Sequence, residues 1–220
     1  MFFTYPATAT KDNWLHESLV YAIQRLLADV SARKRTPKWP DYLLPEHRDA
    51  LRSRRSLRDR LGDLRKALRG LTQPERDLVA QALESQNKIA DLLNCTADCE
   101  TLDELPLTTR APIKAIFEKA FGLLTPFGLR DKHYKAIHAS LPRTICPFCG
   151  CEYFDRPTAK RETLDHYLAE SRYPFAGSNL RNLVPMGTKC NTKYKLAKDI
   201  LRSDSGNRRA AFDPYGANPG

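Results

Sequence analysis

The stretch "SLRDRLGDLRKALRGL", residues 56–71, repeats leucine at alternating steps of four and three residues. This spacing places the leucines on one face of an α-helix, as in the a/d seam of a coiled coil. From Arg48 to Arg69 the chain carries nine basic and three acidic residues. We therefore expect a helix with one buried face and one strongly cationic face. The leucines of the seam are Leu57, Leu61, Leu64, Leu68 and Leu71.

A second helix should follow the seam directly. Gly70 is a typical helix terminator, and in "TQPE" Thr72 can cap a new helix while Glu75 reaches back to it. Apolar residues continue at helical spacing from Leu78 to Leu93. We expect this helix to pack against the seam as an antiparallel hairpin.

Further helices are predicted on both sides of this pair. Apolar residues recur at helical spacing over residues 13–35, with Asp12 or Asn13 available as the cap. The same pattern predicts helices at about 109–124 and 129–140. Residues 1–141 therefore read as an all-helical domain.

Charge and composition bound the class of protein. The net charge is +10, and the hydrophobic fraction of 41% can fill a core. An excess of this size favours a polyanionic partner, most often nucleic acid and sometimes a membrane surface, over a merely basic surface. The first residues lack the features of a secretory signal, and no run of eighteen apolar residues predicts a membrane span. With six cysteines and no signal, we expect a cytoplasmic protein whose clustered cysteines bind metal.

The composition changes after Pro142, where Cys, Gly, Pro and Asn become frequent. Residues 142–220 carry thirteen basic and eight acidic residues, so this smaller part is also cationic. We predict a second unit over 142–205 and an irregular tail over 206–220. The expected fold class is α+β.

Four short motifs follow one another in the second unit. They are "CPFCG" at 146–150, "TLDHYLAES" at 163–171, "NLRNLVPM" at 179–186 and "KCNTKYK" at 189–195. His166 titrates near neutral pH and can take a proton from water. Asp165 and the amide oxygen of Asn191 are ligands that a hard cation such as Mg²⁺ accepts. A base beside a cation site suits the hydrolysis of a phosphodiester.

In their order and spacing these motifs resemble the HNH endonucleases, the ββα-metal nucleases. The resemblance covers about residues 143–202 and implies that His166 is the general base. It implies that Asp165 and Asn191 hold the divalent metal and that Asn182 fixes the loop that orients His166. It also indicates phosphate contacts for Arg181, Lys193 and Lys195, all in the matched motifs.

The resemblance extends to partners. Nuclease subunits of this kind accompany an ATPase in phage-defence or mobile-element systems, and we expect DNA as the substrate. The cationic helix would add contacts to nucleic acid through Arg54, Arg55 and Arg58. Related chains continue past a "DPY" such as that at 213–215, so this chain is either naturally short or truncated.

Adjacent residues of a strand point to opposite faces, so Asp165 and His166 can share one site only if the strand bends there. We therefore predict a bend where this strand ends.

A structural zinc is left open by the sequence. Relatives with zinc carry a second C-x-x-C pair, but here Gly187 stands at its first position and only Cys190 remains. Cys146, Cys149 and Cys190 make three of the four ligands that a closed tetrahedral site needs. Cys151 is a strained candidate for the fourth, and without zinc the knuckle would be held by packing alone. Cys95 and Cys99 read as buried or incidental.

Two other functions compete with a nuclease. The charge would serve a non-catalytic nucleic-acid-binding module on a zinc-knuckle scaffold equally well. Alternatively, the leucine seam could join this chain to another subunit or to a second copy, which would make the protein an oligomer.

Overall fold

The computed structural model describes residues 3–159, 164–196 and 198–216. Thr163 of the Asp-His motif and the last four residues of the tail lie outside these ranges. The fold combines α-helices with a two-stranded antiparallel sheet, so the predicted α+β class is confirmed. The α-helices are α1 (Trp14–Ser31), α2 (Arg48–Leu51), α3 (Arg55–Arg69), α4 (Gln73–Ser85), α5 (Ile89–Leu93), α6 (Leu107–Leu123) and α7 (Leu129–Ser140).

The strands and short helices complete the order of elements. The strands are β1 (Leu164–His166) and β2 (Leu183–Pro185), and a π-helical segment, η6 (Cys190–Lys195), follows them. Short 3-10 helices are η1 (Ala7–Thr10), η2 (Pro45–His47), η3 (Leu102–Glu104), η4 (Pro174–Ala176) and η5 (Leu180–Asn182). The helical segment that begins at Cys190 is short, because Leu196 leaves the helical conformation with a φ of 52°.

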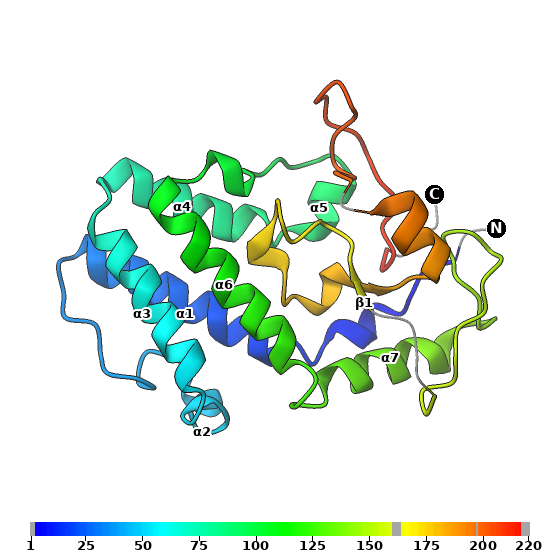
Figure 1. Ribbon diagram of the computed structural model, residues 1–220, viewed down its shortest axis with the longest axis horizontal. Helices are drawn as coiled ribbons and strands as arrows, with labels where there is room; N and C mark the ends of the chain where they lie inside the picture. Colours follow the sequence, from blue (N-terminus) through cyan, green and yellow to red (C-terminus); the bar gives the residue numbers. More distant parts are fainter. Residues whose placement is uncertain (1–2, 160–163, 197, 217–220) are drawn as a thin grey trace.

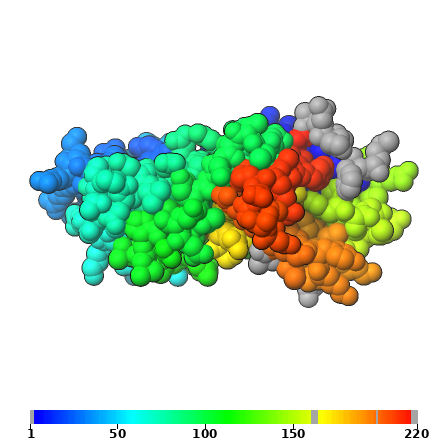
Figure 2. Space-filling view, turned by 90° about the horizontal axis from the view of Figure 1, so that it is seen from above, coloured from blue at the N-terminus to red at the C-terminus, as the bar shows by residue number. Residues whose placement is uncertain are grey.

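Helices α1, α3, α4 and α6 gather at one end of an elongated molecule, and β1 with the chain around it lies toward the other (Figure 1). Figure 2 shows the same elongation from above, with the cyan helices at one end and the orange segment near η6 at the other. In the described ranges, no helix has both the length and the apolarity of a membrane span.

The leucine seam lies on α3 as expected, but its partner is not the predicted one. Leu57, Leu61, Leu64 and Leu68 are fully buried, and α3 packs chiefly against α6 and α1. The expected hairpin of α3 with α4 is wrong, since α4 packs on α1 instead. Helix α6 buries more apolar residues than α4 does, among them Ile113, Ile116, Phe117 and Ala120.

Two predicted helices are interrupted. The cationic helix breaks between α2 and α3, where the Trp39 indole donates to the Arg52 carbonyl at 2.9 Å and so occupies an acceptor of the helix. The next helix breaks between α4 and α5 at Gln86, whose fully buried side chain bonds Glu100 and Phe175. The predicted capping box of Thr72 and Glu75 is confirmed.

Apolar side chains from both parts of the sequence share their cores. Leu164, Phe175, Leu180 and Leu183 belong to the cluster built by α1, α3 and α6. A second cluster joins Tyr5, Leu92 and Ile137 of the helical part to residues such as Tyr167 and Val184. The division at residue 141 stays a prediction, but the strands are positioned directly by the helices.

Candidate functional site

Strands β1 and β2 place the Asp-His pair. They run antiparallel, with Asp165 opposite Val184 and His166 opposite Leu183. The chain bends at Tyr167 and Leu168, directly after β1, where the sequence predicts a bend. Asp165 contacts η6, while His166 packs on α6, so the two side chains meet different elements.

The imidazole of His166 is held in one orientation. Its Nε2 lies 2.8 Å from the carbonyl oxygen of Gly177, and its ring centroid is 4.4 Å from that of Phe121 on α6. A carbonyl only accepts, so Nε2 carries the proton and Nδ1 keeps its lone pair. Burial lowers the pKa of His166 to about 4, against a hydrogen bond to Gly177 that raises it. His166 is therefore neutral at physiological pH, with Nδ1 as the basic atom.

Glu170 is a further acid of this site that sequence reasoning missed. Its Oε2 lies 3.8 Å from Nδ1 of His166. Burial, with the charge of Glu118 on α6, raises the pKa of Glu170 to about 7, while Lys114 opposes the shift. The sequence held one signal, because Glu170 follows His166 by four residues within the quoted motif.

Asp165 is neutralised by a lysine in this conformation. Its Oδ2 lies 2.7 Å from Nζ of Lys195, and both side chains are largely buried, at 15% and 8% exposure. Burial raises the pKa of Asp165, and the nearby Lys195 ammonium opposes that shift. Lys195 therefore lies inside the site, whereas Lys193 is exposed on η6.

The oxygen donors near η6 suit a hard divalent cation in type. Asn191 lies in the first turn of η6, where its N–H donates to the Gly187 carbonyl at 3.0 Å. Asp165 belongs to no group of three His, Cys, Asp or Glu donors among the described residues. A cation on Asp165 would have to displace the Lys195 ammonium, whose flexible stem permits that movement.

Asn182 joins the turn after β1 to the segment before β2. It is fully buried, and its Oδ1 accepts from the Leu168 N–H at 2.6 Å. Its Nδ2 donates to the carbonyls of Leu168 and Ala176 at 3.1 and 3.2 Å. These bonds fix the loop that follows His166.

Three cysteines converge beside η6. The sulfurs of Cys146, Cys149 and Cys190 lie within 4.8 Å of one another, as a group able to hold a metal such as zinc. Burial raises the pKa of Cys190, and it does so for Cys146 against several backbone N–H bonds. For Cys149, burial also raises the pKa, but the N–H groups of Cys151 and Glu152 and the neighbouring thiols outweigh it, so that the pKa is lowered overall.

The other cysteines lie apart from this group. Cys151 is exposed, and its sulfur lies 3.2 Å from the Cys149 carbonyl. Cys95 is exposed and Cys99 is buried.

Most of the predicted phosphate-binding cations have partners within the chain. Arg181 pairs with Asp213 at 2.6 Å, and Arg58 pairs with Asp59 at 2.7 Å. The Arg54 guanidinium lies 4.8 Å from the centroid of the Phe127 ring. Arg55 is exposed at the start of α3.

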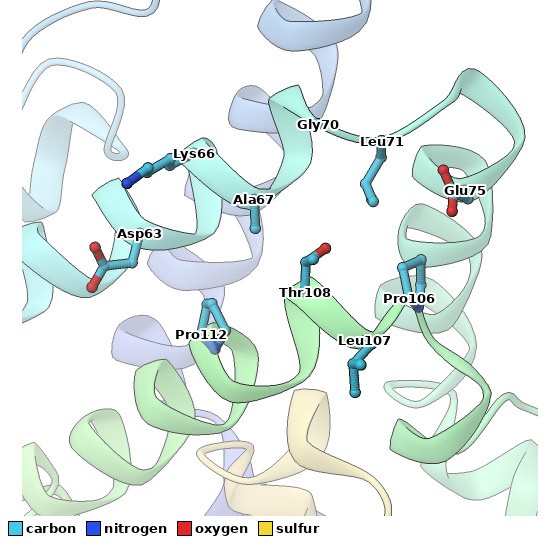
Figure 3. A pocket seen from close by; sticks show the side chains of 10 residues that line it. All are labelled: Asp63, Lys66, Ala67, Gly70, Leu71, Glu75, Pro106, Leu107, Thr108 and Pro112. Carbon is cyan, nitrogen blue, oxygen red and sulfur yellow. The ribbon is translucent and has the colours of Figure 1, made fainter.

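A groove opens near the start of α6, whereas His166 packs near the end of that helix. It lies between the end of α3, the start of α4 and the start of α6, with a volume of about 610 Å³ (Figure 3). Leu107 lines it with 77% of its surface exposed. None of the candidate catalytic residues lines this groove.

No protein-family model, no curated protein and no solved structure matches this chain. Its function is therefore argued from the local geometry around His166 and from the motifs that resemble the HNH endonucleases.

Proposed function

We propose that this protein is a metal-dependent endonuclease of the HNH type that hydrolyses phosphodiester bonds of nucleic acid, with DNA as the expected substrate. One observation carries the proposal. His166 ends a strand with Nε2 fixed on the Gly177 carbonyl and the lone pair of Nδ1 available. Asp165 precedes it, and the paired strand begins directly after Asn182.

Each residue then has a chemical task. Nδ1 of His166 would take the proton of the attacking water. Asn182 would hold the loop that positions the imidazole. Asp165 and Asn191 would hold a divalent ion such as Mg²⁺, which supplies positive charge against the charge that develops on the phosphate. Lys195, once separated from Asp165, would face the same phosphate.

The charge of the chain supports a polyanionic substrate. The net charge is +10, and the exposed side of α3 is rich in arginine. Contacts of this kind are independent of sequence and weaken with added salt. An ATPase partner in a defence or mobile-element system is proposed from the resemblance alone. Self-association would have to use another surface of the helical part, because Leu57, Leu61, Leu64 and Leu68 of the seam are buried within the chain.

A cleavage panel tests the proposal. The full chain is incubated with supercoiled plasmid, a single-stranded oligonucleotide and tRNA, each with Mg²⁺, Mn²⁺ or Zn²⁺. We expect cutting of DNA that His166→Ala abolishes while salt-sensitive binding remains. His138→Ala, on α7, is the matched control and should cut normally. If the wild type cuts none of the substrates, or His166→Ala cuts like the wild type, the proposal is wrong.

A non-catalytic nucleic-acid-binding protein is the second candidate function. The observation that favours it is the closed state of the site, with Asp165 paired to Lys195 and His166 packed on Phe121. It predicts salt-sensitive binding that His166→Ala leaves unchanged, together with no cleavage in any ion. Fluorescence anisotropy with labelled DNA, run beside the cleavage panel, distinguishes the two.

A further inference from the structure

A closed structural zinc site requires four ligands. In the part of the chain that the structure describes, no fourth His, Cys, Asp or Glu donor belongs to the three-cysteine group. Its sulfurs come from the knuckle at Cys146 and Cys149 and from Cys190 at the start of η6. Cys151 does not complete the set, because its exposed sulfur lies against the Cys149 carbonyl. The fourth donor must therefore come from another residue near these sulfurs.

The position of residue 187 shows where a fourth donor belongs. The sulfur of Cys146 accepts from the N–H of Gly187 at 3.4 Å, so residue 187 lies against the three-cysteine group. Position 187 precedes Cys190 by three residues, as Cys146 precedes Cys149. By this spacing, a fourth donor is expected where the side chain of residue 187 would lie.

The Glu152 carboxylate takes that place. The Lys189 N–H donates to Glu152 Oε1 and Oε2 at 3.2 and 3.1 Å. Residue 187 is a buried glycine, and a Cβ atom added to it would lie 2.3 Å from Glu152 Oε2 and 2.8 Å from its Cδ. Glu152 therefore fills the space that a side chain at position 187 would have taken.

We propose that Glu152 is the fourth ligand of a zinc ion held by Cys146, Cys149 and Cys190. Zinc accepts carboxylate oxygens as well as thiolates. Three thiolates with one carboxylate carry the same total charge as four thiolates, so the electrostatics of the site are kept. Binding the ion releases the thiol protons, and the Glu152 side chain swings from the Lys189 N–H onto the metal.

The test measures zinc directly in the full chain, without reference to cleavage. Zinc content is measured by mass spectrometry of the metal, affinity by competition with a chromogenic chelator, and ligand type by the absorption spectrum of the Co²⁺-loaded protein. Glu152→Gln keeps a carbonyl acceptor for the Lys189 N–H but removes the anionic ligand. It therefore separates metal binding from simple capping of this turn. Cys151→Ser is the matched neighbouring control.

We expect one zinc per chain in the wild type. Glu152→Gln should weaken zinc binding by more than about tenfold, since even outer-shell changes cost that much. Cys151→Ser should bind zinc like the wild type. The double variant Glu152→Ala with Gly187→Cys should regain zinc and show stronger sulfur-to-cobalt charge transfer than the wild type.

Three results would overturn the proposal. They are a wild type without zinc, a Glu152→Gln variant with unchanged affinity and Co²⁺ spectrum, or loss of zinc in Cys151→Ser. Circular dichroism of each variant shows whether it has folded. If Glu152→Gln does not fold, the double variant Glu152→Ala with Gly187→Cys still tests the proposal. All these readouts are independent of cleavage, so an inactive nuclease with intact zinc would count against the proposed function alone.

Discussion

Replacing Glu170 by glutamine should stabilise the protein above neutral pH and leave its stability unchanged in mild acid. The carboxyl lies beside the base nitrogen of His166, and its Oε1 is buried with no hydrogen-bond partner in the described part of the chain. Its pKa is raised from 4.5 to about 7 by burial and by Glu118. The folded state therefore keeps a proton on Glu170 that the unfolded chain has already released.

The sign and size follow from this difference. The free energy of unfolding of the wild type falls as pH rises from 4.5 to about 7, because in this range only the unfolded state gains from ionisation of Glu170. Above that range the contribution of Glu170 no longer changes with pH. At about 1.36 kcal/mol for each pKa unit, the interval corresponds to roughly 3 kcal/mol. Because 21% of the side chain is exposed, solvent screens part of this energy, and we expect about 1–2 kcal/mol.

Denaturant titrations of the wild type and Glu170→Gln at a series of pH values from 5 to 8.5 measure this difference. At pH 8 the melting temperature of the variant should be higher by about 2–4 °C for each kcal/mol gained. His166 acts in the opposite direction, since its lowered pKa costs stability as pH falls below 6.5, but its contribution cancels between the two proteins.

Glu84→Gln is the control for this experiment. Glu84 is exposed, and a hydrogen bond from Lys88 lowers its pKa, so its replacement should slightly destabilise the protein at pH 8. The reasoning would be refuted if Glu170→Gln changed stability equally at pH 5 and pH 8, or lowered it at pH 8.

Three further predictions concern the same region. Asn182→Ala removes three buried hydrogen bonds and leaves backbone groups of Leu168 and Ala176 unpaired. We expect the free energy of unfolding, measured by urea denaturation, to fall by about 3–4 kcal/mol, and a decrease below about 1 kcal/mol would contradict this expectation. Leu164→Ala opens a cavity in the cluster shared with α1, α3 and α6 and should cost about 2–5 kcal/mol. Calorimetry should still show one transition, and two separate transitions would mean that the parts unfold independently. If His166 is the base, its pKa of about 4 places the acidic limb of the pH–rate profile for cleavage well below 6, and a limb centred near 6.5 would argue against this assignment.

Local features of this fold could be read from the sequence. The helix predicted over 129–140 is α7, and the capping box at Thr72 and the bend after His166 are where the sequence indicates them. For the helix and the capping box the decisive atoms lie within a few residues of one another, so a short window of sequence contains the physical cause. The bend is held in addition by Asn182, which bonds the backbone of Leu168.

Features that depend on distant partners could not be read in the same way. Asn13 was predicted as a possible helix cap, but it makes no side-chain cap bond, and its Oδ1 accepts from the N–H of Leu180 instead. The leucine seam identified a buried face, while its partner was decided by the larger apolar face of α6. Lys195 was expected to be a phosphate contact and lies against Asp165.

The shared core has a consequence for biosynthesis. Near the start of α1, His16 contacts Ser178, while Asn13 accepts from Leu180, at separations of 162 and 167 residues. At roughly 5–20 residues per second, the ribosome delivers these partners about 8–30 s after α1 itself. Throughout that interval the nascent helices lack the apolar residues Leu164, Phe175 and Leu183 that cover them. Apolar surface that stays exposed for that time is prone to aggregate, and such distant contacts favour slow closure of the finished fold.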